Sequence, residues 1–368
     1  MKRTFLTLVL IAGISAAGFA DEFTLYAGEG AYIAPVAGNT AIYSFFVNIV
    51  AEPFQFPLIG FFNMALGNHH LPQFGFVNSN TGDFTTIQAG FVNTVGGNFT
   101  GLQAGYINTS MGNTIGMQSG FINTSMGEVR GAQFGFINTS RGEVRGAQFG
   151  HINTSMGDTT GAQFGFINTS RGNMRGAQFG FVNSSIGALS GLQLGFINFA
   201  DSVEEGIPIG FISIVRDGGF RVVEYTFSEF FPAGVGLKLG VERFYTTISV
   251  SYSPTGGDNW ENYVVIGIGF GSIIPISAPF FFNPELTSFA PLLRRGEAQQ
   301  QQLMSFVPLV GFNINRHFSV IAGPSVTWSW TEGGAGTSRE PFFSIMSHDI
   351  NDRHSIIVGA RAGLRFRF

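Results

Sequence analysis

The side chains in this sequence that could do chemistry are few, and their spacing does not assemble a reactive site. His69 and His70 are adjacent. Because neighbours on a strand point to opposite faces, we do not expect them to chelate one metal ion. The glycines at 267, 269 and 271 have no helix pattern after them, so they do not predict a phosphate site. There is no cysteine, and we find no Ser-His-Asp arrangement, no paired carboxylates and no cluster of metal ligands. The sequence therefore predicts no enzyme activity, no cofactor and no metal.

The most regular charges are arginines in the middle of the chain. They are Arg130, Arg141, Arg145, Arg171 and Arg175. Glu128, Glu143 and Asp158 lie close to them in the sequence. Stacked on adjacent strands, these groups predict a solvated rim whose charges compensate one another, and a contact with an anion or with lipopolysaccharide phosphate is the alternative. His151 replaces an aromatic residue in a regular column, which we interpret as a neutral substitution.

These residues belong to a repeat. Residues 131–155 read GAQFGFINTSRGEVRGAQFGHINTS, which is almost the same phrase twice. Gln recurs every 15 residues from Gln73 to Gln193, Gly follows two places later, and the next residue is aromatic in every copy except at His151. Asn closes each copy, in a register that runs from Asn48 to Asn198. A fixed period of this length predicts one small structural unit copied many times.

One copy, DTTGAQFGFINT at residues 158–169, alternates with period two and predicts a strand. Ala162, Phe164 and Phe166 share one face, and the Gly and Gln residues share the other. The Thr-Ser-x-Gly segment between copies predicts a hairpin turn. We interpret the glutamines as facing a polar lumen. These are Gln88, Gln103, Gln118, Gln133, Gln148, Gln163, Gln178 and Gln193.

The two ends of the chain predict export and membrane assembly. A basic start, a short apolar run from Phe5 to Ile14 and small residues up to Ala20 predict a signal peptide over residues 1–20. At the other end, the alternating last strand resembles the C-terminal targeting strand of bacterial outer-membrane barrels. That resemblance implies that Gly363, Phe366 and Phe368 are read by the barrel-assembly machinery.

Composition favours a membrane β-barrel. Charged residues make up 11% of the chain, whereas globular domains average roughly 25%. Removal of Lys2 and Arg3 with the signal peptide leaves 17 of the 19 basic residues against 23 acidic ones, a net charge near −6 that argues against a nucleic-acid partner. The sequence has no apolar stretch of about 18 residues after the signal peptide, so we expect strands rather than helices to cross the membrane.

We therefore predict an all-β fold, a transmembrane antiparallel barrel of about 18–22 strands with the repeat strands forming part of its wall. The alternative is a β-solenoid repeat region followed by a smaller C-terminal barrel, because a 15-residue unit without a 30-residue period also fits parallel stacking. The expected divisions are the signal peptide at 1–20, the N-terminal and repeat strands at 21–215, and the C-terminal barrel strands at 216–368.

The Gly-x-Gln-x-Gly-Phe-Ile-Asn copies resemble the bacterial surface-repeat proteins of spirochaetes and Bacteroides-type bacteria. The segment INFADSVEEGIPIGFISIVRDGGF at residues 197–220 is similar to the closing segment of that family, and the resemblance covers roughly residues 40–270. It implies a surface or outer-membrane location, with outer-membrane lipid and lipopolysaccharide as partners. The expected function is a porin-like passive pore or a structural envelope protein. The alternative is a surface-exposed adhesin or antigen built on the repeats.

Overall fold

The protein is described from a computed structural model, which places residues 32–36, 39–43, 45–52, 54–252, 264–291, 301–331 and 341–368. Every regular element in these residues is a β-strand, so the all-β prediction is confirmed. The chain divides into two compact units, Met1–Gly187 and Ala188–Phe368. The expected signal peptide at 1–20 lies outside the described residues.

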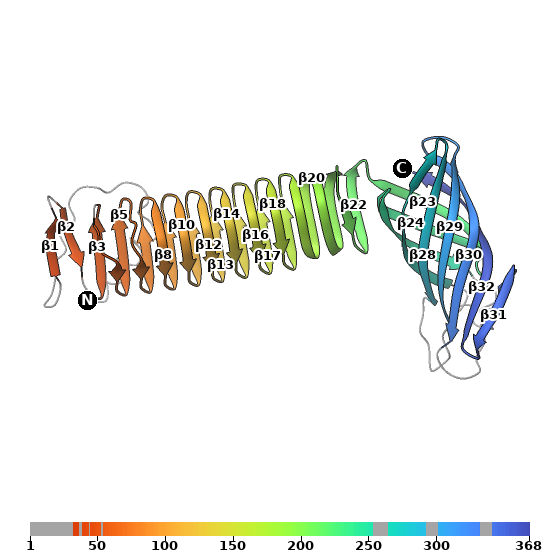
Figure 1. The fold of residues 1–368 in the computed structure, drawn as a ribbon, viewed down its shortest axis with the longest axis horizontal. Helices are drawn as coiled ribbons and strands as arrows, with labels where there is room; N and C mark the ends of the chain where they lie inside the picture. Colours follow the sequence, from red (N-terminus) through yellow and green to blue (C-terminus); the bar gives the residue numbers. More distant parts are fainter. Residues whose placement is uncertain are drawn as a thin grey trace. The chain divides into compact units, whose positions relative to one another are not determined.

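The first sheet has 22 strands and contains the repeat (Figure 1). Apart from the antiparallel pairs β1–β2 and β2–β3, its strands pair in parallel. The strands are β1 Tyr32–Val36, β2 Asn39–Tyr43, β3 Val47–Ala51, β4 Leu58–Ile59, β5 Phe62–Leu66, β6 Gln73–Phe74, β7 Val77–Asn80, β8 Phe84–Ala89, β9 Val92–Val95, β10 Phe99–Ala104, β11 Ile107–Ser110, β12 Thr114–Ser119, β13 Ile122–Ser125, β14 Val129–Phe134, β15 Ile137–Ser140, β16 Val144–Phe149, β17 Ile152–Ser155, β18 Thr159–Phe164, β19 Ile167–Ser170, β20 Met174–Val203, β21 Ile207–Ile209 and β22 Ile212–Asp217.

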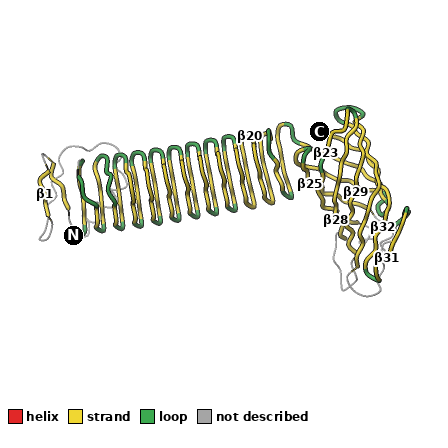
Figure 2. The backbone as a smooth tube through the Cα atoms, viewed as in Figure 1, coloured by secondary structure: helices red, strands yellow, loops and turns green. Residues whose placement is uncertain are grey.

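Each 15-residue copy forms one coil with two strands. A six-residue strand such as β12 pairs with β14 one copy later, which places Gln118 opposite Gln133. A four-residue strand such as β13 pairs with β15 in the same way, which places Asn123 opposite Asn138. Figure 2 shows the two strands of each coil joined by a bend at both ends. The repeat is therefore a parallel solenoid.

The prediction that the repeat strands form the wall of an 18–22-stranded barrel is wrong, and the solenoid alternative is the one observed. The error came from the Gly-aromatic pair, which we treated as strand interior and which forms the second bend of the coil. At Gly135 an added Cβ would meet the Gly120 carbonyl and would lie 2.5 Å from Asn123 Nδ2. Only glycine lets successive coils approach this closely, so the invariant spacing of Gly and aromatic marks a corner.

The second sheet is antiparallel and closes into an eight-stranded barrel. The wall strands are β23 Phe220–Ser228, β24 Ala233–Val241, β25 Phe244–Tyr252, β26 Val264–Gly271, β28 Phe280–Pro291, β29 Gln301–Asn313, β30 Phe318–Thr331 and β32 His354–Arg367. Pairing of β23 with β32 closes the ring. Two further strands attach to this wall: β27 Ile274–Ser277 pairs with β28, and β31 Met346–Asn351 pairs with β32.

The change from parallel to antiparallel pairing falls between Asp217 and Phe220. β28 continues to Pro291 and contains Pro284. Proline is normally disfavoured within a sheet because it lacks the N–H donor, so a strand at this position is hard to predict from the sequence. The side chains of Phe281, Asn283 and Glu285 in β28 are all buried, at spacings of two residues.

Candidate functional site

The repeat glutamines lie inside the solenoid, so their expected position on a pore lumen is corrected. All eight side chains from Gln88 to Gln193 are fully buried. They face a narrow interior shared with one Asn, a small polar residue and usually one apolar residue per coil, such as Asn123, Ser125 and Val129. Their inward direction agrees with the predicted alternation, but the space they face is the dry centre of a coil.

Hydrogen bonds between coils satisfy these buried amides. Gln133 Nε2 donates to Gln118 Oε1 of the preceding coil at 2.7 Å. Asn123 Nδ2 donates in the opposite direction, to Asn138 Oδ1 of the following coil at 2.8 Å, and also to the Phe134 carbonyl at 2.8 Å. Because an unpaired buried amide costs about 1–3 kcal/mol, the two ladders specify the register of every coil. Their role is structural.

The N-terminal end of the glutamine ladder has a different interior. Leu58 lies opposite Gln73 and has no side-chain amide to accept a hydrogen bond. Gln73 Nε2 has no hydrogen-bond partner among the described residues. In the same region His69 occupies the position taken by Phe84 one coil later, and the two rings lie 6.1 Å apart. Burial, assisted by the charge of His70, lowers the pKa of His69 to about 4. The histidine is therefore a neutral core residue near pH 7.

Arg130 and Arg145 of the expected charged rim form ion pairs beside the Thr-Ser-x-Gly turns. Arg130 Nε lies 2.9 Å from Glu128 Oε1, and Arg145 Nε lies 2.9 Å from Glu143 Oε1 and 3.3 Å from Glu128 Oε1. The hydrogen bond from Arg130, helped by the nearby arginine charges, lowers the pKa of the Glu128 carboxyl. These pairs compensate one another in solvent, and exposed pairs of this kind contribute little to stability.

The barrel interior holds a cluster of charges that sequence reasoning missed. Its members are Glu224, Lys238, Glu285, Arg361 and Arg365, all of them buried. Lys238 Nζ lies 2.5 Å from Glu285 Oε1 and 3.3 Å from Glu224 Oε2. Arg365 bridges the same carboxylates, with Nε 2.5 Å from Glu224 and Nη2 2.8 Å from Glu285. The signal that could have found this cluster is the placement of charges at alternate positions in otherwise apolar strands.

Arg361 and two neutral side chains complete the cluster. Arg361 lies 3.5 Å from Glu224 Oε1 and 3.4 Å from Glu285 Oε2. Tyr245 donates its hydroxyl to Glu285 Oε1 at 2.6 Å, and Asn283 Nδ2 donates to that hydroxyl at 2.6 Å. Three cations and two carboxylates thus tie β23, β24, β28 and β32 together across the interior.

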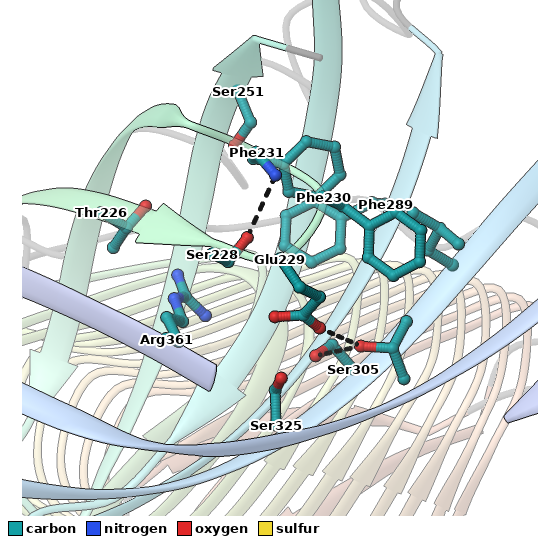
Figure 3. Close-up of a pocket in the computed structure, with 12 residues that line it drawn as sticks. Thr226, Ser228, Glu229, Phe230, Phe231, Ser251, Phe289, Ser305, Ser325 and Arg361 are labelled. Carbon is teal, nitrogen blue, oxygen red and sulfur yellow. Dashed lines mark hydrogen bonds between the residues drawn. The ribbon is translucent and has the colours of Figure 1, made fainter. Parts of the chain in front are cut away.

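A second polar group lies around Glu229. Its Oε1 accepts a hydrogen bond of 2.9 Å from the Thr327 hydroxyl, and the Thr327 and Ser305 hydroxyl oxygens are hydrogen-bonded at 3.0 Å. Glu229 Oε2 has no partner among the described residues, and it borders a cavity of about 10 Å³ that Arg361 and Ser325 also line (Figure 3). A cavity of this size holds about one water molecule, so the interior is filled rather than open at this level.

The outer surface of the barrel is apolar. On β23, Val223, Tyr225 and Phe227 are exposed and alternate with buried Val222, Glu224 and Thr226. The same pattern of exposed apolar side chains recurs around the ring. Further members are Val235, Leu237, Val250, Tyr252, Ile268, Phe270, Phe306, Val310, Phe312, Phe318, Val320, Val326, Trp328, Ile356, Leu364 and Phe366. The barrel therefore exposes an apolar outer surface, which water-soluble domains avoid, while its interior combines the charged cluster with buried apolar side chains such as Phe281, Phe289 and Leu309.

The expected assembly residues lie on or just after the strand that closes the barrel. Gly363 in β32 pairs opposite Thr226 on one side and Ile321 on the other. Phe366 faces outward, with its ring centroid 5.2 Å from that of Phe318. Phe368 follows the end of β32 and is 54% exposed. Phe366 and Phe368 are thus exposed, whereas Gly363 is half-buried and shares the inward register of Arg361 and Arg365.

Comparisons with protein-family models, with curated proteins and with solved structures found no match. Among the described residues, no three His, Asp or Glu side chains gather in a way that could hold a metal ion. In the same part of the chain, no helix is long and apolar enough to span a membrane.

Proposed function

We propose that the eight-stranded barrel is inserted in a bacterial outer membrane and anchors the solenoid as a surface-exposed module. The observation that carries this proposal is the apolar outer surface of a barrel whose interior contains a buried charged cluster. Its interior holds five clustered charges, and its exterior is a ring of exposed Phe, Val, Ile, Leu, Tyr and Trp side chains. In water this exterior would be a large exposed apolar surface, whereas in a membrane it would contact lipid. A membrane also requires that the strand ring leave no unpaired edge.

Closure of the ring supports the same conclusion. Because β23 pairs with β32, every wall strand has a paired neighbour on each side and the ring has no open edge. An open edge would leave such groups unpaired in hydrocarbon, at a cost of several kcal/mol for each group. The barrel has the strand number of the smallest outer-membrane barrels.

The filled interior favours an anchor over a porin-like pore. Barrels of eight strands have an interior that side chains can fill, and aqueous channels occur in barrels of about 16–18 strands. Here the ion cluster and Tyr245 cross the interior. We therefore place the adhesin or antigen hypothesis first, with the solenoid as the part that binds, and expect purified protein to give no stepwise conductance in a planar bilayer. Regular conductance steps would return the pore to first place.

The proposal also includes the export, the assembly and the lipid surroundings of the barrel. The signal peptide at 1–20 exports the chain, and the barrel-assembly machinery reads Gly363, Phe366 and Phe368. Outer-membrane lipid and lipopolysaccharide then surround the apolar exterior. A surface or outer-membrane location is also what the resemblance of the Gly-x-Gln-x-Gly-Phe-Ile-Asn copies to the surface-repeat family implies.

Quenching of tryptophan fluorescence by lipid tests the anchor. Trp328 is exposed on the outer face of β30. A variant with W260F and W330F keeps Trp328 as its one tryptophan, and the full chain would be reconstituted into vesicles whose acyl chains carry bromine. We expect strong quenching of Trp328 and a blue-shifted emission. A matched protein that keeps Trp328 but is mixed with unbrominated vesicles is the control. Protein that stays in the supernatant, or emission that bromine leaves unchanged, would contradict insertion.

A further inference from the structure

One corner of the solenoid carries a continuous stack of aromatic rings. The members of this aromatic ladder are Phe46, Phe61, Phe76, Phe91, Tyr106, Phe121, Phe136, His151, Phe166 and Phe181. Successive ring centroids lie 4.8 to 5.3 Å apart, and their planes differ by at most 8°. The ladder thus follows the coil spacing, and all of these residues belong to the first unit.

The rings present their edges to solvent. Each ring face is covered by the neighbouring rings, yet Phe76, Phe91 and Phe136 remain 44 to 46% exposed. A planar ligand that stacks on aromatic faces therefore finds no free face between the rings of the ladder. What the ladder offers is a long, narrow row of apolar edges.

Apolar side chains border the ladder on both sides. A second stack of Phe134, Phe149, Phe164 and Phe179 has centroids 4.9 Å apart. On the other strand the outward positions next to the ladder are Ile or Val, as at Ile122 and Ile137. We name the ladder with these flanking positions the apolar edge.

Charged residues are confined to the other side of the coil. Between residues 61 and 187 the Asp, Glu and Arg residues all lie at the Thr-Ser-x-Gly turn or within the first two residues of the following strand. They are Asp83, Glu128, Arg130, Arg141, Glu143, Arg145, Asp158, Arg171 and Arg175. The ladder itself has no Asp, Glu, Lys or Arg; its polar side chains are Tyr106, stacked between Phe91 and Phe121, and His151, stacked between Phe136 and Phe166. The edge is therefore suited to an apolar partner.

We propose that the apolar edge is a self-association surface and that its partner is the same edge of a second copy of this chain. At about 44% exposure each ring offers roughly 90 Å², so the nine phenylalanine and tyrosine rings offer on the order of 800 Å². That equals the roughly 800 Å² that each partner buries in a stable complex of standard size. A second copy also has the same ring spacing, so every ring edge meets an equivalent edge, as in dry interfaces between identical stacked strands. The inference goes beyond anchoring and depends on the solenoid alone.

Cysteine cross-linking of the full chain locates this interface, because the protein has no cysteine of its own. Ser119 is the last residue of β12, two residues before the ladder ring Phe121. Met111 lies at the opposite turn of a neighbouring coil and is 45% exposed. With a short bismaleimide we expect S119C to form covalent dimers and the matched control M111C to form none. The reaction would be run both in vesicles and in detergent, so that failed membrane insertion and failed association give different results.

Sedimentation of the full chain in detergent gives the second readout. The wild type should dimerise in a concentration-dependent way. The variant F91Q/F121Q/F136Q should weaken association by about 100-fold or more, since central aromatic anchors dominate interface energies. The control M111Q/M156Q/I186Q removes apolar side chains of similar exposure at the opposite turn and should leave association unchanged.

H151F completes the ladder and should strengthen association. This test remains valid even if the glutamine variant does not fold. The proposal would be overturned by wild type that stays monomeric at all concentrations, by equal cross-linking of S119C and M111C, or by a monomer whose ladder instead binds lipid vesicles.

Discussion

Replacement of Asn123 by alanine removes one rung of the asparagine ladder in the middle of the solenoid. The native side chain donates to Asn138 Oδ1 and to the Phe134 carbonyl, and it accepts a hydrogen bond of 2.8 Å from Asn108 Nδ2. The Phe134 carbonyl keeps its bond from the Gly120 N–H at 2.9 Å. Two polar atoms therefore lose a partner in a fully buried setting: Asn138 Oδ1 and one hydrogen of Asn108 Nδ2.

The expected cost follows from these two atoms. Each buried polar group left without a partner costs about 1–3 kcal/mol, and the small void adds to this. We expect N123A to destabilise the central coils by about 2–6 kcal/mol. The neighbouring Thr124 faces outward and is half-buried, so T124A is a matched control with an expected change of about 0.5 kcal/mol or less.

Native-state hydrogen exchange measured by mass spectrometry separates the local effect from the rest of the chain. Protection of the amides in coils 105–140 should fall by at least about 30-fold, because each 1.4 kcal/mol corresponds to tenfold. Coils near residues 60–80 should change little, since coils contact only their neighbours. A loss of protection below about fivefold, or an equal loss in T124A, would refute the argument that buried amide ladders hold the solenoid together.

Four further outcomes follow from the structure. Arg365→Met removes the guanidinium contacts to Glu224 and Glu285 while Lys238 and Arg361 remain, so the barrel should lose about 1.5–3 kcal/mol, measured as a lower temperature at which the folded band disappears on SDS gels. His69 has a pKa of about 4 in the folded repeat and near 6.5 in the unfolded chain. The unfolded chain therefore binds the extra proton, and stability falls by on the order of 2 kcal/mol as the pH drops from 6.5 to 4. H69F should abolish this pH dependence in circular-dichroism melts. Gly135→Ala should cost about 2 kcal/mol or more, seen in the same melts, because its methyl group would meet the Asn123 amide. Phe368→Ala should lower the amount of protein in isolated outer membranes, whereas Phe318→Ala, an outward Phe of similar exposure, should not.

The sequence allowed the strands and their inward faces to be predicted, but not the way in which the repeat strands pair. Alternation places Gln163 inward and Phe164 outward in a barrel wall and in a solenoid alike, because both have the same period of two. The difference lies in the Gly165-Phe166 pair, which reverses the chain and shifts the alternation by one residue, so that Asn168 also points inward. Steric contact between glycines 15 residues apart, which no local pattern reveals, decides this point.

The ion cluster escaped prediction for a related reason. Glu224, Lys238 and Glu285 are far apart in the sequence. In the closed barrel, Lys238 Nζ lies 3.3 Å from Glu224 Oε2 and 2.5 Å from Glu285 Oε1. The three residues lie on three different strands, and only the ring order of β23, β24 and β28 shows that they share one interior. The apolar outer face was easier to anticipate, since it follows directly from strand alternation.

Spin labels on β23 test the central claim, that the barrel faces lipid with its apolar side. Single cysteines at Val223, Tyr225 and Phe227 would carry a nitroxide in the full chain reconstituted into lipid vesicles, with a label at Met111 of the solenoid as the exposed control. The account predicts that the three barrel labels collide readily with dissolved oxygen and poorly with a water-soluble nickel chelate, and that the control does the reverse. Barrel labels that collide with the nickel chelate as often as the Met111 label would show that this surface lies in water, and the account of the protein as a membrane-anchored repeat would be contradicted.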